Sequence, residues 1–328
     1  MSNQNSSLKK IILSGIQPSG TVHLGNYFGM MRPAIELQDK GLPLLFIADY
    51  HALTTIPRPD ELKSRIFDLA VDFLALGLDP EKTIFFRQSQ VPQVTQLTWI
   101  LSCITPMGLL ERCHSYKDKT SKGIPANHGL FAYPVLMAAD ILIYNSNIVP
   151  VGKDQKQHVE VARDIALKFN GIYGDVFTLP EPMIREDVAV IPGIDGQKMS
   201  KSYGNTIEIF GNEKEILKKI MSIKTDSTPL EEPKNPDNCP VFAIYKQLAT
   251  EVQINDIKKK YLAGNYGYGH AKKELCEAFK TYFAPFNSKR KDLANNPDFV
   301  ESTLKKGEEK AREIASSTMK NVLNAIGL

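Results

Sequence analysis

The feature that most constrains the fold is the alternation of short apolar runs with an amphipathic segment in the first half of the chain. Between residues 59 and 79, apolar residues recur at helical spacing, Pro59 begins the segment and Gly77 ends it, which predicts a helix. Three apolar runs are typical of buried strands: "KIILSGI" (10–16), "LPLLFIAD" (42–49) and "KTIFFRQS" (82–89). Later strands are predicted at 147–152 and 188–191, with a helix at 154–169 between them. This order predicts an α/β fold with a parallel sheet and right-handed crossovers.

The character of the sequence changes after about residue 205. Amphipathic helices are predicted at 212–224, 239–249, 270–286 and 301–326. We therefore expect two domains, an α/β domain over residues 1–205 and an all-helical domain over residues 206–328.

Composition limits the compartment and the partners. The first ten residues are polar and lack the apolar core of an export signal, and no run approaches the ~18–20 apolar residues of a membrane span. The four cysteines form no C-x-x-C pair. We expect a soluble cytoplasmic protein with reduced thiols and no membrane partner. The net charge of +3 is too small to indicate nucleic-acid binding by the whole chain, so any basic surface must be local.

The segment "SGIQPSGTVHLGNYFG" (14–29) joins the first strand to the first helix. Such a turn lies at the carboxyl edge of a parallel sheet, where these sheets bind ligands, and amides at a helix N-terminus can face a phosphate. His23 and Asn26 are three residues apart, so they share one face of a helical turn. An ordinary glycine turn with a surface histidine is the alternative. The absence of GxGxxG disfavours a dinucleotide fingerprint.

The segment "GQKMSKS" (196–202) is too polar for a core strand and too short for a helix. It predicts a flexible loop whose ammonium groups, on Lys198 and Lys201, bind an anion. Because the loop follows the strand predicted at 188–191, we expect it at the same sheet edge as the first turn. A solvated surface loop is the alternative. The turn and the loop together predict one site for a nucleotide.

These two motifs resemble the HIGH-type and KMSKS motifs of class I aminoacyl-tRNA synthetases. The blocks "YPVLMAADILIYN" (133–145), "VPVGKDQKQHVEVARDIA" (149–166) and "GEEKAREIASSTM" extend the resemblance to the bacterial-type tryptophanyl-tRNA synthetases, from about residue 10 to the end. The resemblance implies a Rossmann-like catalytic domain over 1–205, with a dimer-contact insertion at about 90–150, and a helical anticodon-binding domain over 206–328. It also implies a symmetric homodimer with tRNA(Trp) as partner.

The resemblance implies a two-step reaction. ATP activates L-tryptophan to tryptophanyl-adenylate with release of pyrophosphate, and the tryptophanyl group then passes to the 3′ end of tRNA(Trp). A carboxylate is ionised at neutral pH, so the first step needs alignment and charge neutralisation rather than a general base. The implied catalytic residues are His23, Asn26, Lys119, Lys198 and Lys201. The implied ATP contacts are Gln17, Pro18, Ser19, Gly25, Asn26, Gly152, Lys153, Asp154, Ile191, Lys198, Met199, Ser200, Lys201 and Ser202.

The resemblance also implies a tryptophan pocket, in which Asp140 accepts a hydrogen bond from the indole N–H. A carboxylate in an apolar helix is costly to bury without a partner, which agrees with this role; an ion-paired or surface aspartate is the alternative. The implied walls and contacts are Leu13, Met137, Val149, Val151, Tyr133 and Gln155, and His51 either lines the pocket or is structural. His114, His128 and His158 show no ligand spacing.

Metals are expected only with the substrate. Mg²⁺ would accompany ATP, held mainly by phosphate and water. Some relatives carry an iron–sulfur cluster on cysteines of the helical domain. Here only Cys239 and Cys276 lie in that domain, so four thiolate ligands cannot be assembled, and we expect neither a cluster nor a protein-bound metal.

Three alternatives share part of this pattern. A tyrosyl-tRNA synthetase has both motifs, but the blocks at 133–145 and 149–166 favour tryptophan. A small nucleotidyltransferase has no need of so large a helical domain. A non-catalytic RNA-binding paralogue is disfavoured by the intact motif residues. The basic residues at 258–260, 272–273 and 289–291 suit either an RNA backbone or a solvated face.

Overall fold

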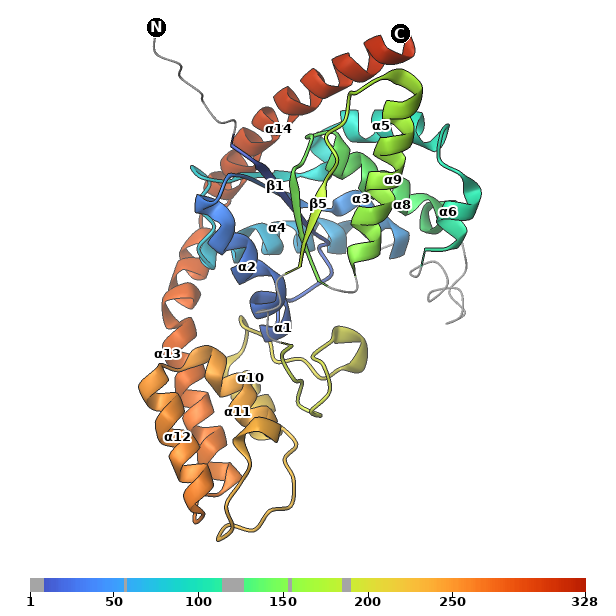
Figure 1. The fold of residues 1–328 in the computed structure, drawn as a ribbon. Helices are drawn as coiled ribbons and strands as arrows, with labels where there is room; N and C mark the ends of the chain where they lie inside the picture. Colours follow the sequence, from blue (N-terminus) through green and yellow to red (C-terminus); the bar gives the residue numbers. More distant parts are fainter. Residues whose placement is uncertain (1–8, 56–57, 114–126, 153–154, 185–189) are drawn as a thin grey trace, which may run out of the picture.

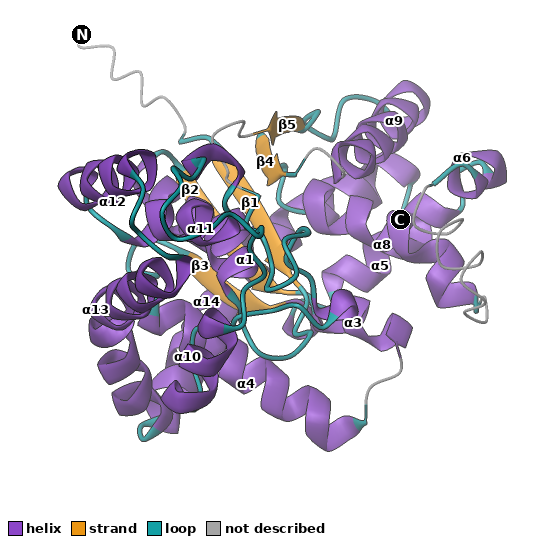
Figure 2. Ribbon diagram, turned by 90° about the horizontal axis from the view of Figure 1, so that it is seen from below, coloured by secondary structure: helices purple, strands orange, loops and turns teal. Residues whose placement is uncertain are grey.

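The computed structural model describes residues 9–55, 58–113, 127–152, 155–184 and 190–328. Its described part contains a five-stranded sheet in the order β3-β2-β1-β4-β5, in which every neighbouring pair is parallel (Figures 1 and 2). The strands are β1 (Ile11–Ile16), β2 (Leu42–Ile47), β3 (Ile84–Arg87), β4 (Ile148–Val151) and β5 (Glu181–Ile184). The predicted α/β fold with a parallel sheet is therefore confirmed.

The strand order reverses direction between β1 and β4. From β1 the chain builds β2 and β3 on one side, and it then returns to place β4 and β5 on the other. In open parallel sheets, such a reversal leaves a crevice beyond the carboxyl ends of the two central strands. Here these ends are Ile16 and Val151. The expected ligand-binding edge of the sheet therefore lies at the segments 14–29 and 149–166, which both contain predicted site residues.

The strand predicted at 188–191 is not found where it can be tested. Residues 190 and 191 are not in a strand, residues 185–189 lie outside the described part, and the fifth described strand is β5 at Glu181–Ile184. Its sequence "EPMI" is half-buried and contains Pro182. An edge strand tolerates proline and needs no continuous apolar run, so β5 lacks the signal that reveals β1 to β3.

The helices cover the sheet and extend beyond it. The predicted helix at 59–79 corresponds to α4, which ends at Ala75, and the one at 154–169 to α9. Periodicity does not predict α12, because only Ile257 and Tyr261 are buried there. The described α-helices are α1 (Leu24–Asn26), α2 (Arg32–Glu36), α3 (Asp49–Ala52), α4 (Pro59–Ala75), α5 (Gln93–Ser102), α6 (Met107–Glu111), α8 (His128–Leu142), α9 (Lys156–Tyr173), α10 (Glu213–Met221), α11 (Pro240–Leu248), α12 (Glu251–Ala263), α13 (Tyr268–Ala294) and α14 (Pro297–Ile326), and a π-helical turn spans Tyr27–Met31.

Helices α10 to α13 form a bundle at one end of the molecule, whereas α14 runs back along the sheet (Figure 1). Val300 and Leu304 of α14 join the same apolar core as Phe85, while Ala311 and Met319 join the core that contains Phe86. Since Phe85 and Phe86 are successive residues of β3, they face opposite sides of the sheet. Helix α14 therefore passes along β3 from one face of the sheet to the other.

Charged side chains also connect the C-terminal helices α13 and α14 with α4 and β3. Arg290 of α13 donates to Asp72 Oδ1 of α4 at 2.6 Å and to Asp68 Oδ1 at 3.0 Å. Arg87 of β3 donates to Glu308 Oε1 of α14 at 2.6 Å. Within the described residues, none of the helices combines the length and the apolar character required to cross a membrane.

Candidate active site

The first turn is organised by a reciprocal cap at the start of α1. The backbone N–H of Asn26 donates to His23 Nδ1, and the backbone N–H of His23 donates to Asn26 Oδ1, both at 3.3 Å. This capping box fixes the imidazole at the carboxyl end of β1. The two residues that the sequence places on one helical face thus hold each other in position.

The lysine loop packs directly against this turn. Lys201 Nζ donates to the carbonyl oxygen of Ser19 at 3.0 Å, and the Gly25 amide contacts Met199 Sδ at 3.4 Å. Met199 is buried, and its own amide donates to the carbonyl of Ile191 at 2.9 Å. The structure therefore brings together two segments that are about 180 residues apart in the sequence.

The charges of this region are shaped by burial. The pKa of His23 is lowered from 6.5 to about 4, mainly by burial and also by the ammonium of Lys201, whereas Glu208 acts in the opposite direction. The imidazole is therefore neutral at pH 7. Because Nδ1 accepts the Asn26 amide, the ring proton lies on Nε2, which makes Nε2 a hydrogen-bond donor. Burial also lowers the pKa of Lys201, and the nearby Arg65 adds to this effect.

Asn205 holds the lysine loop, a role that no sequence motif indicated. Asn205 is buried, its Oδ1 accepts the Ser200 amide at 2.8 Å, and its Nδ2 donates to the Lys198 carbonyl at 3.1 Å. Ser200 Oγ lies 2.8 Å from Ser202 Oγ. The side chain of Lys198 is exposed at the tip of this braced loop.

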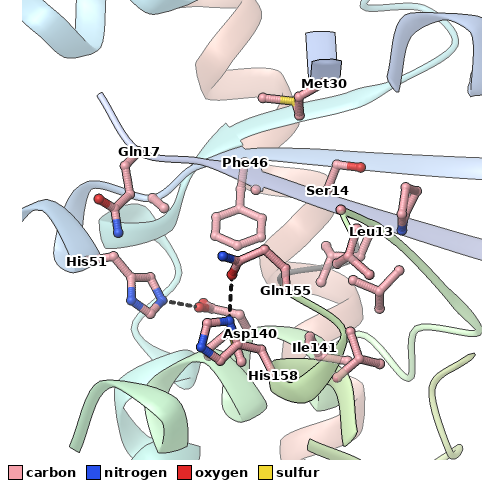
Figure 3. Close-up of a pocket in the computed structure, with 18 of the residues that line it drawn as sticks. Leu13, Ser14, Gln17, Met30, Phe46, His51, Asp140, Ile141, Gln155 and His158 are labelled. Carbon is pink, nitrogen blue, oxygen red and sulfur yellow. Dashed lines mark hydrogen bonds and ion pairs between the residues drawn. The ribbon is translucent and has the colours of Figure 1, made fainter. Parts of the chain in front are cut away.

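An apolar cavity of about 430 Å³ lies beside the turn (Figure 3). All eight residues predicted for the tryptophan pocket line it: Leu13, His51, Tyr133, Met137, Asp140, Val149, Val151 and Gln155. Gln17 and Gly152, predicted as ATP contacts, line the same cavity. The cavity and the turn with its lysine loop therefore form one continuous candidate site at the carboxyl edge of the sheet.

Asp140 is a buried carboxylate in this cavity. His51 Nε2 lies 2.8 Å from Asp140 Oδ2, and Gln88 Nε2 donates to both carboxylate oxygens, at 2.8 and 2.9 Å. Burial raises the pKa of Asp140, and the hydrogen bonds from His51 and Gln88 oppose this by favouring the ionised form. A surface aspartate is thus excluded, and His51 both lines the cavity and contacts the carboxylate.

The comparisons with known proteins agree with this geometry. The sequence model of the family described as tRNA synthetases class I (W and Y) matches residues 6–284.

The chain belongs to this family.

Its relatives are similar over nearly their whole length. A tryptophan–tRNA ligase of Fusobacterium nucleatum is 55% identical over 319 residues, which cover 96% of this chain and 97% of the relative. One of Campylobacter jejuni is 51% identical, covering 97% of this chain and 99% of the relative. A crystal structure of the tryptophanyl-tRNA synthetase from Campylobacter jejuni, complexed with ADP and tryptophan, superposes with a TM-score of 0.92 at 51% identity and covers 97% of this chain and all of that one.

A second polar group also lines the cavity. His158 Nδ1 lies 2.5 Å from Gln155 Oε1 (Figure 3). His158 Nε2 lies 3.1 Å from Tyr133 OH. Sequence spacing gave no role to His158, because a single histidine on an amphipathic helix has no distinctive pattern. Its separation of three residues from Gln155 is the signal that could have placed it here. Phe46 and Ile141 are further lining residues that the sequence did not single out.

Three predicted site residues, Lys119, Lys153 and Asp154, lie outside the described residues. Across the described ranges, no group of three or more histidine, cysteine, aspartate or glutamate side chains is arranged to hold a metal ion. Cys239 is buried with its Sγ 3.4 Å from Tyr261 OH, and Cys276 is buried in α13. The described donors therefore do not form a site for a metal or a cluster.

Proposed function

We propose that this chain is a tryptophan–tRNA ligase. It activates L-tryptophan with ATP to tryptophanyl-adenylate and transfers the tryptophanyl group to the 3′ end of tRNA(Trp). The observation that carries the proposal is that a candidate nucleotide-binding region and a candidate amino-acid pocket meet at one edge of the sheet. A cation-bearing loop contacts a capped histidine turn, and an apolar cavity with a buried carboxylate opens beside them. The names of the relatives at 51–55% identity support the same activity.

ATP binds along the turn and the loop. The Nε2–H of neutral His23 donates to a phosphate oxygen, and Lys201 and Lys198 neutralise the charge that develops as pyrophosphate leaves. Lys201 already reaches the turn, since its Nζ lies 3.0 Å from the Ser19 carbonyl. Lys119 joins these cations, and Mg²⁺ accompanies the phosphates. The remaining contacts are those assigned by resemblance: Gln17, Pro18, Ser19, Gly25, Asn26, Gly152, Lys153, Asp154, Ile191, Met199, Ser200 and Ser202.

Tryptophan binds in the cavity with its indole N–H on Asp140. A carboxylate has about four acceptor positions. Among the described residues, three are used, two on Oδ2 by His51 and Gln88 and one on Oδ1 by Gln88. Oδ1 can therefore accept one more hydrogen bond. A buried acceptor left without its donor is costly, so phenylalanine is rejected. The shape of the cavity must reject tyrosine.

The assembly and the RNA contacts follow the family. The chain acts in the cytoplasm as a homodimer whose contact includes residues 90–150, where Trp99 and Met107 are exposed large apolar side chains. Residues 1–205 form the catalytic domain and residues 206–328 the anticodon-binding domain, with the basic residues of α12 and α13 facing the RNA backbone.

Amino-acid-dependent ATP–pyrophosphate exchange tests the proposal. We expect exchange with L-tryptophan and not with L-tyrosine, followed by charging of tRNA(Trp) transcripts. Exchange with tyrosine alone would assign the chain to the other specificity of its family. Exchange with either amino acid but no charging would refute the ligase activity.

A further inference from the structure

Gln88 is fully buried at the end of β3, in the short 3₁₀ helix Gln88–Gln90. Its Nε2 donates to Asp140 Oδ1 at 2.8 Å and to Oδ2 at 2.9 Å, while its Oε1 accepts the backbone amide of Tyr50 at 3.1 Å. Both ends of the amide are therefore engaged, and its orientation is fixed by its partners. A donor that contacts both oxygens of a carboxylate also fixes the rotation of that carboxylate.

This contact is distinct from the one made by His51. The imidazole meets only Oδ2, at 2.8 Å, and comes from α3, whereas Gln88 comes from the end of β3. With His51 alone, the carboxylate could turn about its χ2 torsion, which is a soft torsion for aspartate. Gln88 removes this freedom, because a rotated carboxylate would lose one of the two contacts to Nε2.

We propose that Gln88 is a positioning residue for selection of the amino-acid substrate. It holds Asp140 in an orientation that leaves one acceptor position of Oδ1 available to the substrate's N–H donor. The inference rests on the proposed function, since it concerns how the same cavity distinguishes tryptophan from analogues without the donor. Gln88 does not itself line the cavity wall, so it acts through Asp140.

The ionisation of Asp140 depends on the same contact. A protonated carboxyl would present a donor on one oxygen, which would clash with a donor from the substrate. Burial and the neighbouring Asp49 raise the pKa of Asp140, and His51 and Gln88 lower it. Other titratable groups near the carboxyl are Tyr144, whose own pKa is raised by burial and by Asp140, and Tyr133 and His158, which line the same cavity. Gln88 therefore keeps the carboxylate in its accepting form as well as in its orientation.

The test compares tryptophan with an isostere that lacks the donor, L-3-benzothienylalanine, in which sulfur replaces the indole N–H. Gln88→Met preserves the side-chain length, and the Tyr50 amide keeps a second acceptor in Asp49 Oδ1 at 3.0 Å, so the change leaves no orphaned donor. The matched control is Gln90→Met, the same substitution two residues later in the same 3₁₀ helix, where the side chain is exposed.

In pyrophosphate exchange, the ratio of kcat/KM for tryptophan to kcat/KM for the isostere should be on the order of 10⁴ in the wild type and in Gln90→Met. Gln88→Met should narrow this ratio at least tenfold, mainly through a higher KM for tryptophan. Equal losses for both substrates, which leave the ratio unchanged, would show a purely structural role and overturn the inference. If the wild type showed no exchange with tryptophan, the proposed function would fail and the inference with it, so the two failures are distinguishable.

Gln88→Glu provides a second readout should the methionine variant fold poorly. The introduced carboxyl keeps the length and the acceptor for Tyr50, but it can donate to Asp140 only while the pair shares a proton. We expect kcat/KM for tryptophan in this variant to fall by more than tenfold as the pH rises and the pair loses that proton, whereas the wild-type profile stays flat over the same interval. Parallel profiles would overturn the inference.

Discussion

The neutral state of His23 can be tested by titration. At about 1.36 kcal/mol per pKa unit, a shift from 6.5 to about 4 means that the folded structure disfavours the imidazolium by about 3 kcal/mol. Burial is the main cause of this penalty, since His23 is only 5% exposed, and the ammonium of Lys201 is the second. Nδ1 must also remain unprotonated to accept the Asn26 amide. Because the folded-state pKa lies below the unfolded value, the unfolded chain binds the proton first. Stability is therefore lost as the pH falls from about 6.5 towards 4.

The assay is NMR titration of the histidine rings in the whole chain, which has six histidines. His23→Gln assigns the resonance by its disappearance. At pH 5 the His23 ring should still be about 90% neutral, whereas a histidine with the ordinary value would be almost fully protonated. Lys201→Met should raise the midpoint, since the ammonium is the second cause of the lowering, and added salt should act in the same direction. A midpoint between 6 and 7 in the wild type would refute both the burial argument and the assignment of the proton to Nε2.

Three further predictions concern other parts of the molecule. Lys201→Met should lower kcat for pyrophosphate exchange by about 10²–10³-fold with little change in KM for tryptophan, because its ammonium is assigned to the transition state; a loss below tenfold would contradict this. Asp140→Asn should lower kcat/KM for tryptophan by about 10–100-fold in the same assay. The amide oxygen is a weaker acceptor than a carboxylate, and the amide NH₂ group would face other hydrogen-bond donors. Wild-type values of kcat/KM would show that the carboxylate does not take part in recognition of tryptophan. Gly307→Ala should destabilise the chain by about 1–3 kcal/mol in thermal unfolding, because the added methyl would overlap the Phe85 carbonyl. Gly171→Ala, whose methyl has open space in α9, should be neutral or stabilising by up to about 1 kcal/mol, and equal shifts for the two variants would refute the close contact.

The parts of the fold that the sequence predicts are those whose burial is nearly complete. β2 is buried along almost all its length, so its apolar run is continuous, and the same holds for β3. β5 escaped prediction because an edge strand is partly exposed, and Pro182 further obscures it. The lengths of α13 and α14 were also underestimated, since their terminal turns are polar.

The candidate site shows the same division. The meeting of the histidine turn with the lysine loop could be predicted, because both were expected at the carboxyl edge of one parallel sheet. The partners of Asp140 could not, because a glutamine after a strand has no chemical signature, and its contact with the carboxylate spans 52 residues. Asn205 was missed for a similar reason, as its role depends on backbone groups of the loop rather than on a motif.

The passage of α14 along β3 has a consequence for synthesis of the chain. Arg87 and Glu308 are 221 residues apart, and the last helix supplies part of the core on each side of the strand. Until the ribosome has translated residues 297–326, β3 in the nascent chain has no α14 packed against it. An uncovered strand is a site at which aggregation can begin. Premature termination before α14 should therefore yield an insoluble product rather than an active fragment, even though every residue assigned to catalysis would already have been made.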